Sequence, residues 1–516
     1  TEGDISEDFI ACTRSVLVTG THFSRPHTSA AQKIAMTFAK GYGAKVIFDI
    51  DFRPNLWGLA GHGAGEERYV RSHTVSERLK SVLPHCDLVV GTEEEILIGS
   101  GEADLDAALR AIRQVSSAVI VLKRGPMGCI VYDGVIPENI EDGIVGEGFP
   151  IEVYNTLGAG DAFMSGFLRG WLTGEPLETC ATWANACGAF AVSRLLCSPE
   201  IPSFEELSHF LEHGSARRAL RKDAALNHIH WVTTGRRRDY PTVRALAIDH
   251  RGQLEGMADK VGADRDAIAG FKLLAVEAAA RVADGRDGFG MLLDDKYGRA
   301  ALFAAAKQPN FWIGRPVELP GSRPLKFEFS QDMGSRLIEW PVDHCIKCLA
   351  FFHPDDPDDM RLEQIEKLGA LYDAARSVGR ELLIEIIAGK NGPLEADTVP
   401  RILTELYSAG LQPDWWKLEP QADAAAWTLI DETIAANDPW CRGVVLLGLD
   451  APAEELEAAF KATAGSATVK GFAVGRTIFA SAAEKWLAGE MDDKEAVADM
   501  AGRFSALVDA WEARGQ

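Results

Sequence analysis

Short apolar runs alternate with stretches of helical period along the first part of the chain. The runs typical of buried strands are residues 15–21, 45–50, 87–90 and 118–123. Between and after them, apolar residues recur every three to four positions, which predicts helices at 29–40, 74–83, 93–99 and 103–115. Strands that alternate with helices predict a parallel sheet with helices on both faces, and ligands then collect at the carboxyl ends of the strands.

The same alternation restarts after Arg244. Its strand candidates are 244–249, 289–294, 311–315, 345–352, 381–387, 414–418, 443–449 and 470–475. A helical stretch follows each of them, and eight such units make a closed (β/α)8 barrel. Between the two series, Glu205 to Lys222 predicts a last helix of the first domain. We therefore expect a first α/β domain at 1–222, a linker at 223–242 and a TIM barrel at 243–516.

The net charge and the cysteine content limit which binding partners and which cellular compartment we expect for this protein. The formal net charge of −23 argues against general nucleic-acid binding, which needs a basic surface. The sequence has no apolar run of membrane-spanning length, and we expect neither a membrane span nor a signal peptide. Nine cysteines are scattered, many of them inside apolar runs, which is typical of a reducing, cytoplasmic protein. Cys345 and Cys348 lie in one predicted strand and would face opposite sides, so we do not expect them to bind a metal together.

The stretch 155–168 runs from a glycine-rich turn directly into a helical pattern. Gly158 and Gly160 allow a sharp bend and a close approach to a ligand, and the first amides of the helix then form an anion site. Asp161 lies in that first turn, where a carboxylate suits deprotonation of a hydroxyl that attacks a phosphoryl group. The alternative is an ordinary helix start in which Asp161 only interacts with the helix dipole.

The string Thr-Leu-Gly-Ala-Gly-Asp-Ala-Phe at 156–163 closely resembles the signature of the ribokinase-like (PfkB) sugar kinases. The resemblance implies a three-layer α/β/α fold that uses ATP and Mg²⁺. It also implies that Asp161 is the catalytic base and that Gly158, Ala159 and Gly160 supply the anion hole. Asn155 stands where the family usually has Asp, a position linked to the organisation of the ion and the phosphates.

Weaker motifs follow in the family's order. Residues 49–57 resemble D-x-N-x-R followed by L-W, which makes Arg53 a candidate for holding a substrate carboxylate or phosphate; the alternative is a surface ion pair. Glu95 occupies the place of the N-x-x-E motif and is a candidate for the magnesium-water shell; the alternative is an acidic first helical turn. Gly125 and Gly128 resemble the hairpin beside the nucleotide, and Asn185 lies in an N-A-x-x-A-like element near the adenine.

These kinases normally begin with a segment that carries a G-G-N type sugar motif and the strands of a lid. No such segment precedes Thr1, so roughly a hundred residues of the fold are expected to be missing from this chain. The remaining layer would expose a sheet edge that needs covering or pairing, and we expect a homo-oligomer. Kinase activity is in doubt if this is the whole polypeptide.

Two lysines stand inside apolar strands of the predicted barrel. Burial disfavours the charged form of a lysine, and a neutral amine can attack a carbonyl to form a Schiff base. Lys417 follows Trp415 and Trp416, which we expect to exclude water from it, and Lys347 lies in another strand. Glu385 or Asp249 could carry the protons. The alternative is that both lysines are simply ion-paired with these carboxylates.

Six segments of 244–480, in barrel order, resemble class I tagatose-bisphosphate aldolases. They are Ala-Ile-Asp-His-Arg-Gly, Leu-Leu-Asp-Asp-Lys-Tyr-Gly, Ile-Lys-Cys-Leu-Ala-Phe-Phe-His-Pro, Leu-Ile-Glu-Ile, Trp-Lys-Leu-Glu-Pro and Phe-Ala-Val-Gly-Arg-Thr-Ile-Phe. The resemblance implies that Lys417 forms the imine, with Asp249, Lys347 and Glu385 as acid–base and charge partners and no cofactor. Gly448, Gly475 and Arg476 would then bind the substrate phosphate.

Taken together, the two sets of motifs resemble the fused kinases of bacterial inositol catabolism. This resemblance implies phosphorylation of a sugar acid, 5-dehydro-2-deoxygluconate, followed by cleavage of its 6-phosphate into dihydroxyacetone phosphate and malonate semialdehyde. Arg53 would suit the carboxylate and Arg476 the new phosphate. Two alternatives stay open: a kinase of another sugar or sugar acid with a non-catalytic regulatory barrel, and a non-catalytic scaffold whose first layer serves oligomerisation.

Overall fold

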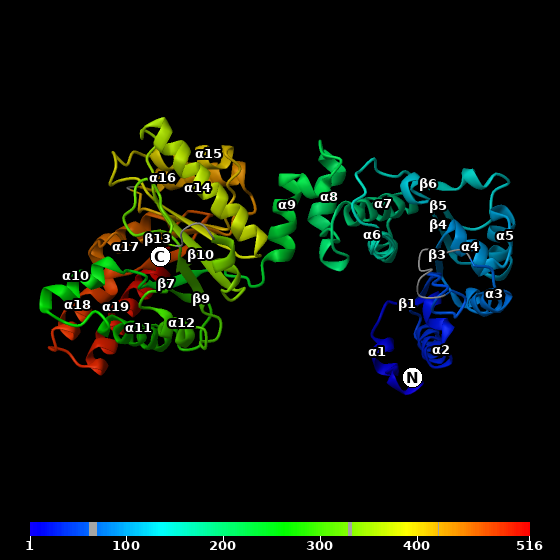
Figure 1. Cartoon of the computed structure of the whole chain (residues 1–516), viewed down its shortest axis with the longest axis horizontal. Coiled ribbons are helices and arrows are strands. Elements are labelled where there is room, and N and C mark those ends of the chain that lie inside the picture. Colours follow the sequence, from blue (N-terminus) through cyan, green and yellow to red (C-terminus); the bar gives the residue numbers. More distant parts are fainter. Residues whose placement is uncertain (61–69, 329–332, 422, 516) are drawn as a thin grey trace. The chain divides into compact units, whose positions relative to one another are not determined.

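The fold is described from a computed structural model, which covers residues 1–60, 70–328, 333–421 and 423–515 (Figure 1). The chain divides into two compact units, Thr1–His230 and Trp231–Gln516. Each unit has its own hydrophobic core, and each is described by itself below.

The first unit is built on a mixed sheet of six strands in the order β1-β2-β3-β4-β5-β6. The strands are β1 (Ser15–Thr19), β2 (Lys45–Asp49), β3 (Leu88–Thr92), β4 (Val119–Lys123), β5 (Cys129–Tyr132) and β6 (Ile144–Gly146). The first four are parallel, and β5 and β6 continue the sheet in antiparallel pairing. The carboxyl ends of β1 to β4 therefore lie along one edge, as the sequence pattern predicted.

Helices cover both faces of this sheet. The helices on one face are α2 (Pro26–Gly41), α3 (His73–Lys80), α4 (Glu93–Ser100) and α5 (Leu105–Val115), and those on the other are α6 (Ala159–Thr173) and α7 (Leu177–Ser193). Strand residues alternate between the faces: Phe48 packs in the core of the first layer, whereas Ile47 packs with α6 and α7. The three-layer α/β/α arrangement is thus confirmed. A short α1 (Glu7–Ala11) precedes β1.

The predicted helix from Glu205 to Lys222 is wrong in its second half. Helix α8 (Phe204–His213) ends at Gly214, whose backbone lies in the left-handed region at φ 69°. A short 3-10 turn, Leu220–Lys222, follows separately. The stretch expected to be a linker contains α9 (Ala224–His230) and a π-helical turn, Trp231–Gly235.

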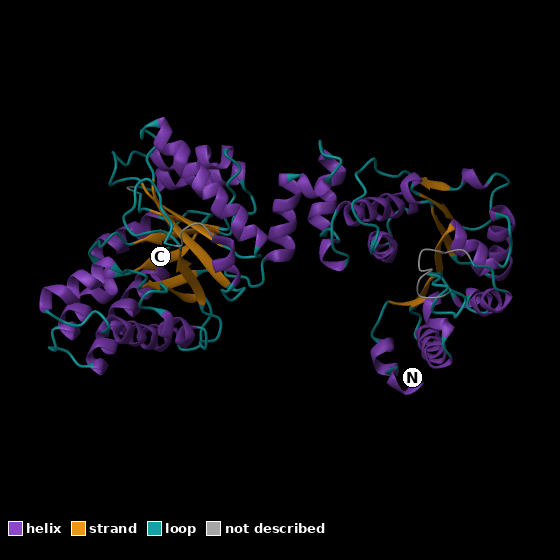
Figure 2. Ribbon diagram, viewed as in Figure 1, coloured by secondary structure: helices purple, strands orange, loops and turns teal. Residues whose placement is uncertain are grey.

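The second unit is a closed barrel of eight parallel strands, which confirms the prediction from the apolar runs (Figure 2). Its strands are β7 (Val243–Ala247), β8 (Phe289–Leu292), β9 (Trp312–Pro316), β10 (His344–Phe351), β11 (Leu382–Ile387), β12 (Trp415–Leu418), β13 (Gly443–Leu447) and β14 (Val469–Val474). Pairing of β14 with β7 closes the barrel.

Helices surround these strands. They are α10 (Gly252–Val261), α11 (Ala267–Ala283), α12 (Arg299–Ala305), α13 (Met333–Ile338), α14 (Asp358–Ser377), α15 (Thr398–Ser408), α16 (Ala424–Asn437), α17 (Ala453–Ala462), α18 (Arg476–Leu487) and α19 (Asp493–Ala513). No helix among the described residues is both long and apolar enough to cross a lipid bilayer.

Side chains on the barrel strands alternate between the interior and the helical shell. Trp415 and Cys345 belong to the interior cluster, whereas Trp416 and Cys348 pack with the outer helices. Cys345 and Cys348 therefore face opposite sides, as expected. The expectation that both tryptophans desolvate Lys417 is wrong for Trp416, because its indole N–H donates to the Tyr407 hydroxyl of α15 at 2.8 Å.

Candidate functional site

Three charged side chains meet at the carboxyl edge of the sheet in the first unit. Asp49 ends β2, Lys123 ends β4, and Glu95 lies in the first turn of α4, directly after β3. Lys123 Nζ lies 3.2 Å from Asp49 Oδ1 and 3.7 Å from Glu95 Oε2. None of the three side chains is more than 15% exposed, so the cluster is a fixed part of the sheet edge.

Burial and charge act against each other in this cluster. Burial, reinforced by the nearby carboxylates of Glu95 and Asp51, raises the pKa of Asp49 to about 6 despite the opposing effect of Lys123. For Lys123, burial alone would lower the pKa, but the attraction of Asp49 and Glu95 outweighs it and raises the pKa. The lysine therefore keeps its positive charge at the sheet edge.

Glu95 also fixes the start of α4. Its Oε2 accepts the backbone N–H of Thr92 at 2.7 Å, while the Thr92 hydroxyl accepts the N–H of Glu95, which makes a capping box. Its Oε1 accepts the N–H of Phe52 at 3.3 Å. The structure thus gives Glu95 the helix-start role considered as the alternative, and its place in a magnesium-water shell stays a prediction.

Helix α6 begins beside Lys123. A Cβ on Gly160 would lie 3.8 Å from Lys123 Nζ. Gly158 is the N-cap and has φ 81°, which favours glycine, and a Cβ there would lie 2.8 Å from Cys197 Cβ. The Ala159 N–H donates to the Thr156 carbonyl at 3.3 Å, and the next amides of the first turn, of Gly160 and Asp161, have no intrahelical partner. Their use as a phosphate site beside Lys123 stays a prediction.

Asp161, the proposed base, and Asn155, in the loop before α6, have different surroundings. Asp161 is exposed in the first turn of α6, where a reacting hydroxyl could reach it. Asn155 holds the preceding loop: its amide donates to the carbonyl of Leu195 at 2.8 Å, and its Oδ1 accepts the N–H of Leu157 at 3.1 Å. Asn155 therefore organises the turn, and the role of Asp161 as base stays a prediction.

Arg53 lies after β2 and pairs with Asp51. Its Nε lies 3.0 Å from Asp51 Oδ1, and half of its side chain is exposed. Asp51 has φ 28°, a conformation that Asn and Asp tolerate better than most residues, which suits its place in the D-x-N-x-R-like motif. An exposed pair of this kind can open to admit a ligand anion at little cost.

The nucleotide-side candidates lie around the hairpin that joins β4 to β5. Gly125 and Gly128 enclose its short 3-10 turn. Asn185, on α7, is buried and donates from its amide to the carbonyl of Gly146 at 3.0 Å and to the thiol of Cys129. Asn185 thus ties α7 to β5 and β6, and its contact with adenine stays a prediction.

In the barrel, four predicted residues form one continuous chain of charges. Glu385 of β11 lies with Oε1 2.9 Å from Lys417 Nζ and with Oε2 2.8 Å from Lys347 Nζ. Lys347 of β10 lies 3.2 Å from Asp249 Oδ2, just after β7. All four side chains are buried, so the structure brings together the residues that the sequence placed on four separate strands.

The charges in this chain stabilise one another. Burial would lower the pKa of Lys347, but three carboxylates raise it well above its ordinary value. Burial would raise the pKa of Asp249 and Glu385, yet Lys347 and the other nearby cations hold both below their ordinary values. At neutral pH, Lys347 is therefore a fixed cation between fixed anions.

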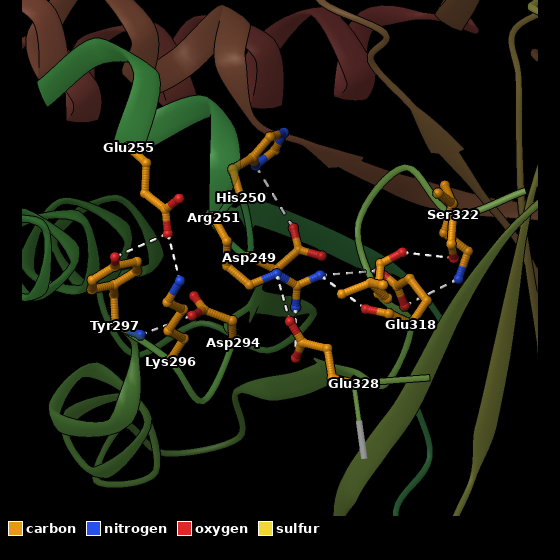
Figure 3. A network of polar contacts seen from close by, with 12 residues as sticks. Asp249, His250, Arg251, Glu255, Asp294, Lys296, Tyr297, Glu318, Ser322 and Glu328 are labelled. Carbon is orange, nitrogen blue, oxygen red and sulfur yellow. Dashed lines mark hydrogen bonds and ion pairs between the residues drawn. The ribbon is translucent and has the colours of Figure 1, made fainter. Parts of the chain in front are cut away.

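A second part of the network was missed by the sequence reasoning. Glu318, two residues after β9, places Oε1 2.9 Å from Lys347 Nζ and 3.5 Å from Arg251 Nη2. Figure 3 shows Arg251 reaching toward both Glu318 and Glu328, with Asp249 and His250 beside it. The sequence signal for Glu318 was a carboxylate in the loop three residues after the predicted strand 311–315.

Lys272 was also missed. It lies on α11 with no exposed surface and donates to the carbonyls of Ile248 at 2.6 Å and His250 at 3.0 Å, and it pairs with Asp294. It thereby fixes the turn that carries Asp249 and His250. The signal in the sequence was a lysine within an otherwise apolar helical stretch, Phe-Lys-Leu-Leu.

The predicted phosphate binders lie at the last strands. Gly475 directly follows β14 and is the N-cap of α18, which begins with Arg476. Arg476 Nη1 lies 3.0 Å from Asp450 Oδ2, and Gly448 directly follows the neighbouring β13. A Cβ on Gly475 would lie 2.5 Å from the carbonyl oxygen of Ala247 and 2.6 Å from His250 Cε1, so only glycine fits there.

Residues 1–60, 70–328, 333–421 and 423–515 contain no group of three or more His, Cys, Asp or Glu side chains placed to hold a metal ion.

Two family models match the chain, over successive stretches of the sequence. Residues 62–203 match the pfkB family carbohydrate kinases, so the fold and sequence define a carbohydrate kinase domain followed by a parallel barrel. Residues 206–515 match a family described as an uncharacterized protein conserved in bacteria (DUF2090). Because this match covers more than half of the chain, the protein belongs to the DUF2090 family. That description gives no activity for the barrel.

The curated relatives match less than half of the chain. The chain is 27% identical over 221 residues to a 5-dehydro-2-deoxygluconokinase of Geobacillus thermodenitrificans, over 42% of this chain and 60% of the relative. It is 28% identical over 217 residues to the Bacillus subtilis protein of the same name, over 40% and 60%. The chain thus spans about 60% of the length of these relatives. A putative ribokinase II from E. coli, solved with ATP and Mg²⁺, is 22% identical over 41% of this chain and 63% of that one, with a TM-score of 0.36.

Proposed function

We propose that the protein is a bifunctional enzyme of inositol catabolism. Its first unit phosphorylates 5-dehydro-2-deoxygluconate with ATP, and its barrel splits the resulting 6-phosphate into dihydroxyacetone phosphate and malonate semialdehyde. The kinase half is supported by the PfkB match and by the similarity to 5-dehydro-2-deoxygluconokinases. The lyase half is supported by the charge chain in the barrel.

In the kinase half, the anion site receives the phosphates of ATP. The first amides of α6 and the Lys123 ammonium are the groups that would hold the transferring phosphate. Asp161 takes the proton of the attacking sugar hydroxyl, and Arg53 pairs with the sugar acid's carboxylate. ATP would supply the phosphoryl group, and Glu95 is the candidate to hold the water shell of a Mg²⁺ ion, which would neutralise the charge of the phosphates.

In the barrel half, the amine of Lys417 adds to the ketone of the substrate, and loss of water gives an iminium ion. Glu385 then accepts the proton of the hydroxyl two carbons away. As that hydroxyl becomes an aldehyde, the carbon–carbon bond breaks, and its electron pair passes to the iminium as an enamine. Protonation and hydrolysis release dihydroxyacetone phosphate and restore the amine. No cofactor takes part.

The position of Glu385 between Lys417 and Lys347 is the observation that carries the lyase proposal. A carboxylate 2.9 Å from the imine-forming nitrogen can move protons to and from it, and Lys347 holds that carboxylate in place from its other oxygen. Asp249 and Glu318 in turn balance the charge of Lys347.

One assay separates the two halves. The purified protein is given 5-dehydro-2-deoxygluconate, and dihydroxyacetone phosphate is followed by enzyme-coupled NADH oxidation. We expect the product to form only when ATP is present. Lys417→Met should accumulate the phosphorylated sugar acid without cleaving it, whereas Asp161→Asn should cleave phosphorylated sugar acid supplied to it but make none.

A kinase of another sugar or sugar acid with a non-catalytic regulatory barrel is the second candidate. The observation that favours it is the pairing of both barrel lysines with carboxylates, which is also what a purely structural network would show. ATP-dependent phosphorylation without any dihydroxyacetone phosphate would support this candidate and contradict the lyase half.

A further inference from the structure

The first unit has a hollow between the 3-10 turn that follows β1, the start of α2 and the end of α3 (Figure 1). The volume of this hollow is about 220 Å³, and it is lined by Phe23, Pro26, Ser29, Lys33, Arg78 and Ser81. Phe23 is buried and packs edge-on against Phe48 of β2, which ties the apolar side of the hollow to the sheet.

Two helices bring polar side chains to this hollow. On α2, Pro26, Ser29 and Lys33 are spaced by three and four residues, which places them on one side of the helix. On α3, Arg78 lies in the last turn, and Ser81 is the C-cap residue three positions later. Each helix therefore contributes one cation and one hydroxyl to the same space.

The two cations are exposed and are not neutralised by a carboxylate. In the part of the chain that the structure describes, no carboxylate pairs with Lys33 Nζ or with the Arg78 guanidinium, which lies 5.7 Å from the centre of the Trp57 ring. The sequence gives the reason for α2, because no Asp or Glu lies between Asp8 and Asp49 in a chain with 76 acidic residues. Two unpaired cations that line one hollow favour an anionic ligand.

We propose that this hollow binds a short phosphate ester, with the phosphate group between Lys33 and Arg78. An ammonium group and a guanidinium fork both donate charge-assisted hydrogen bonds to phosphate oxygens. At about 30 Å³ for each water, the hollow has the volume of about seven waters, which suits a phosphate with a few carbon atoms and not a nucleotide. Phe23 and Pro26 offer apolar surface to the carbon chain.

The hollow is separate from the predicted kinase residues. Helices α2 and α3 pack on one face of the six-stranded sheet, whereas α6, which carries Asp161, packs on the other. The inference therefore goes beyond the proposed function and depends on neither its kinase half nor its lyase half.

Chemical labelling of Lys33 tests the proposal at the site itself. The full chain is acetylated briefly with an activated ester, and mass spectrometry of the peptides gives the extent of labelling at each lysine. Glycerol 3-phosphate is the probe, because it has three carbons and no carbonyl that could react with Lys417. Inorganic phosphate, glycerol and sodium chloride at matched ionic strength are compared with it. Lys461, exposed on α17, is the internal control.

We expect glycerol 3-phosphate to protect Lys33 at concentrations that leave Lys461 fully labelled, and at lower concentrations than inorganic phosphate. In Arg78→Gln, the half-protecting concentration should rise about tenfold or more, which corresponds to the loss of a hydrogen bond to a charged group. Arg71→Gln is the matched control, because Arg71 is exposed and donates instead to the Gly101 carbonyl. It should keep the wild-type protection.

Equal protection of Lys33 by glycerol 3-phosphate and by sodium chloride would show that the ions only screen charge, and it would overturn the inference. Unchanged protection in Arg78→Gln would overturn it as well. If inorganic phosphate protects Lys33 at the same or a lower concentration than the ester, the assignment of an ester is wrong. The comparison in the wild-type protein decides the matter even if Arg78→Gln does not fold.

Discussion

Lys417 Nζ lies 2.9 Å from Glu385 Oε1, and the two residues are register partners on the adjacent strands β12 and β11. Their side chains therefore leave the strands at the same height and both point into the barrel, where each is about 6–7% exposed. A nitrogen and a carboxylate held together in this way can exchange a proton without water. The aldol chemistry proposed for the barrel depends on this pair.

The buried cation Lys347 should be important for stability. Its Nζ is within 3.2 Å of Asp249, Glu318 and Glu385, so Lys347→Met leaves three buried carboxylates without their common partner. Removing one member of a buried ion-pair network costs about 3–5 kcal/mol, which lowers the Tm of a barrel of this size by about 10 °C. Differential scanning calorimetry measures this decrease in Tm.

Lys461→Met is the matched control, because Lys461 pairs with Glu457 on the exposed side of α17. Its loss should change the Tm by no more than about 2 °C. A similarly small change in Lys347→Met would contradict the view that the cation holds the network together.

The buried histidine His344 predicts a loss of stability in mild acid. Burial, with Arg315 nearby, lowers its pKa from 6.5 to about 4. The unfolded chain therefore binds a proton at this residue that the folded chain does not, between those two values. The contribution to stability is complete above the unfolded pKa and is lost as the pH falls toward about 4.

Urea unfolding at about pH 7 and about pH 5, followed by tryptophan fluorescence, tests whether the free energy of unfolding falls with pH because of His344. The wild-type protein should lose about 2 kcal/mol more free energy of unfolding across this interval than His344→Gln, which cannot titrate. Equal losses in the two proteins would show that His344 does not set the acid sensitivity.

Asp161 should matter for rate and not for folding. Its side chain is exposed in the first turn of α6, so Asp161→Asn should leave the Tm unchanged. Loss of a general base lowers the rate of ATP-dependent phosphorylation by about 10²–10⁴-fold, with a smaller effect on the KM for the sugar acid. A coupled assay of ADP release measures the rate of phosphorylation and the KM for the sugar acid.

Glu178→Gln serves as the control, since Glu178 is likewise an exposed acidic residue in the first turn of a helix, α7. It should phosphorylate at the wild-type rate. Equal rates in Asp161→Asn and the wild type would remove Asp161 as the base, and the absence of phosphorylation by the wild type would contradict the kinase half.

The sequence was sufficient for the architecture because the apolar runs have a clear period. All eight barrel strands start and end within two residues of their predicted bounds, and the parallel strands of the first unit are placed as closely. The helix at 205–222 failed because Gly214 adopts a positive φ that ends α8, and the charged residues that follow give no apolar period. The spacing of apolar residues does not reveal that a single residue ends a helix through its backbone conformation.

The site was only partly predictable, because strand ends identify candidates but not their contacts. Looking for charged residues in or at the ends of predicted strands identified Lys347, Glu385 and Lys417. The barrel geometry then brings these three side chains together as a series of ion pairs. The same search did not find Lys272, which reaches the site from a helix, nor the pairing of Glu318 with Lys347, which depends on a loop after β9. The inward and outward alternation that separates Trp415 from Trp416 was available in the sequence and was not applied.

The most direct test of the account is the covalent adduct on Lys417. The protein is incubated with dihydroxyacetone phosphate, reduced with sodium borohydride, digested and examined by mass spectrometry, with Lys417→Arg treated in parallel. We predict a reduced ketone phosphate adduct on the peptide containing Lys417 in the wild type and no adduct in the variant. An unmodified Lys417 in folded, ligand-saturated protein, or an adduct on another lysine, would contradict the central claim.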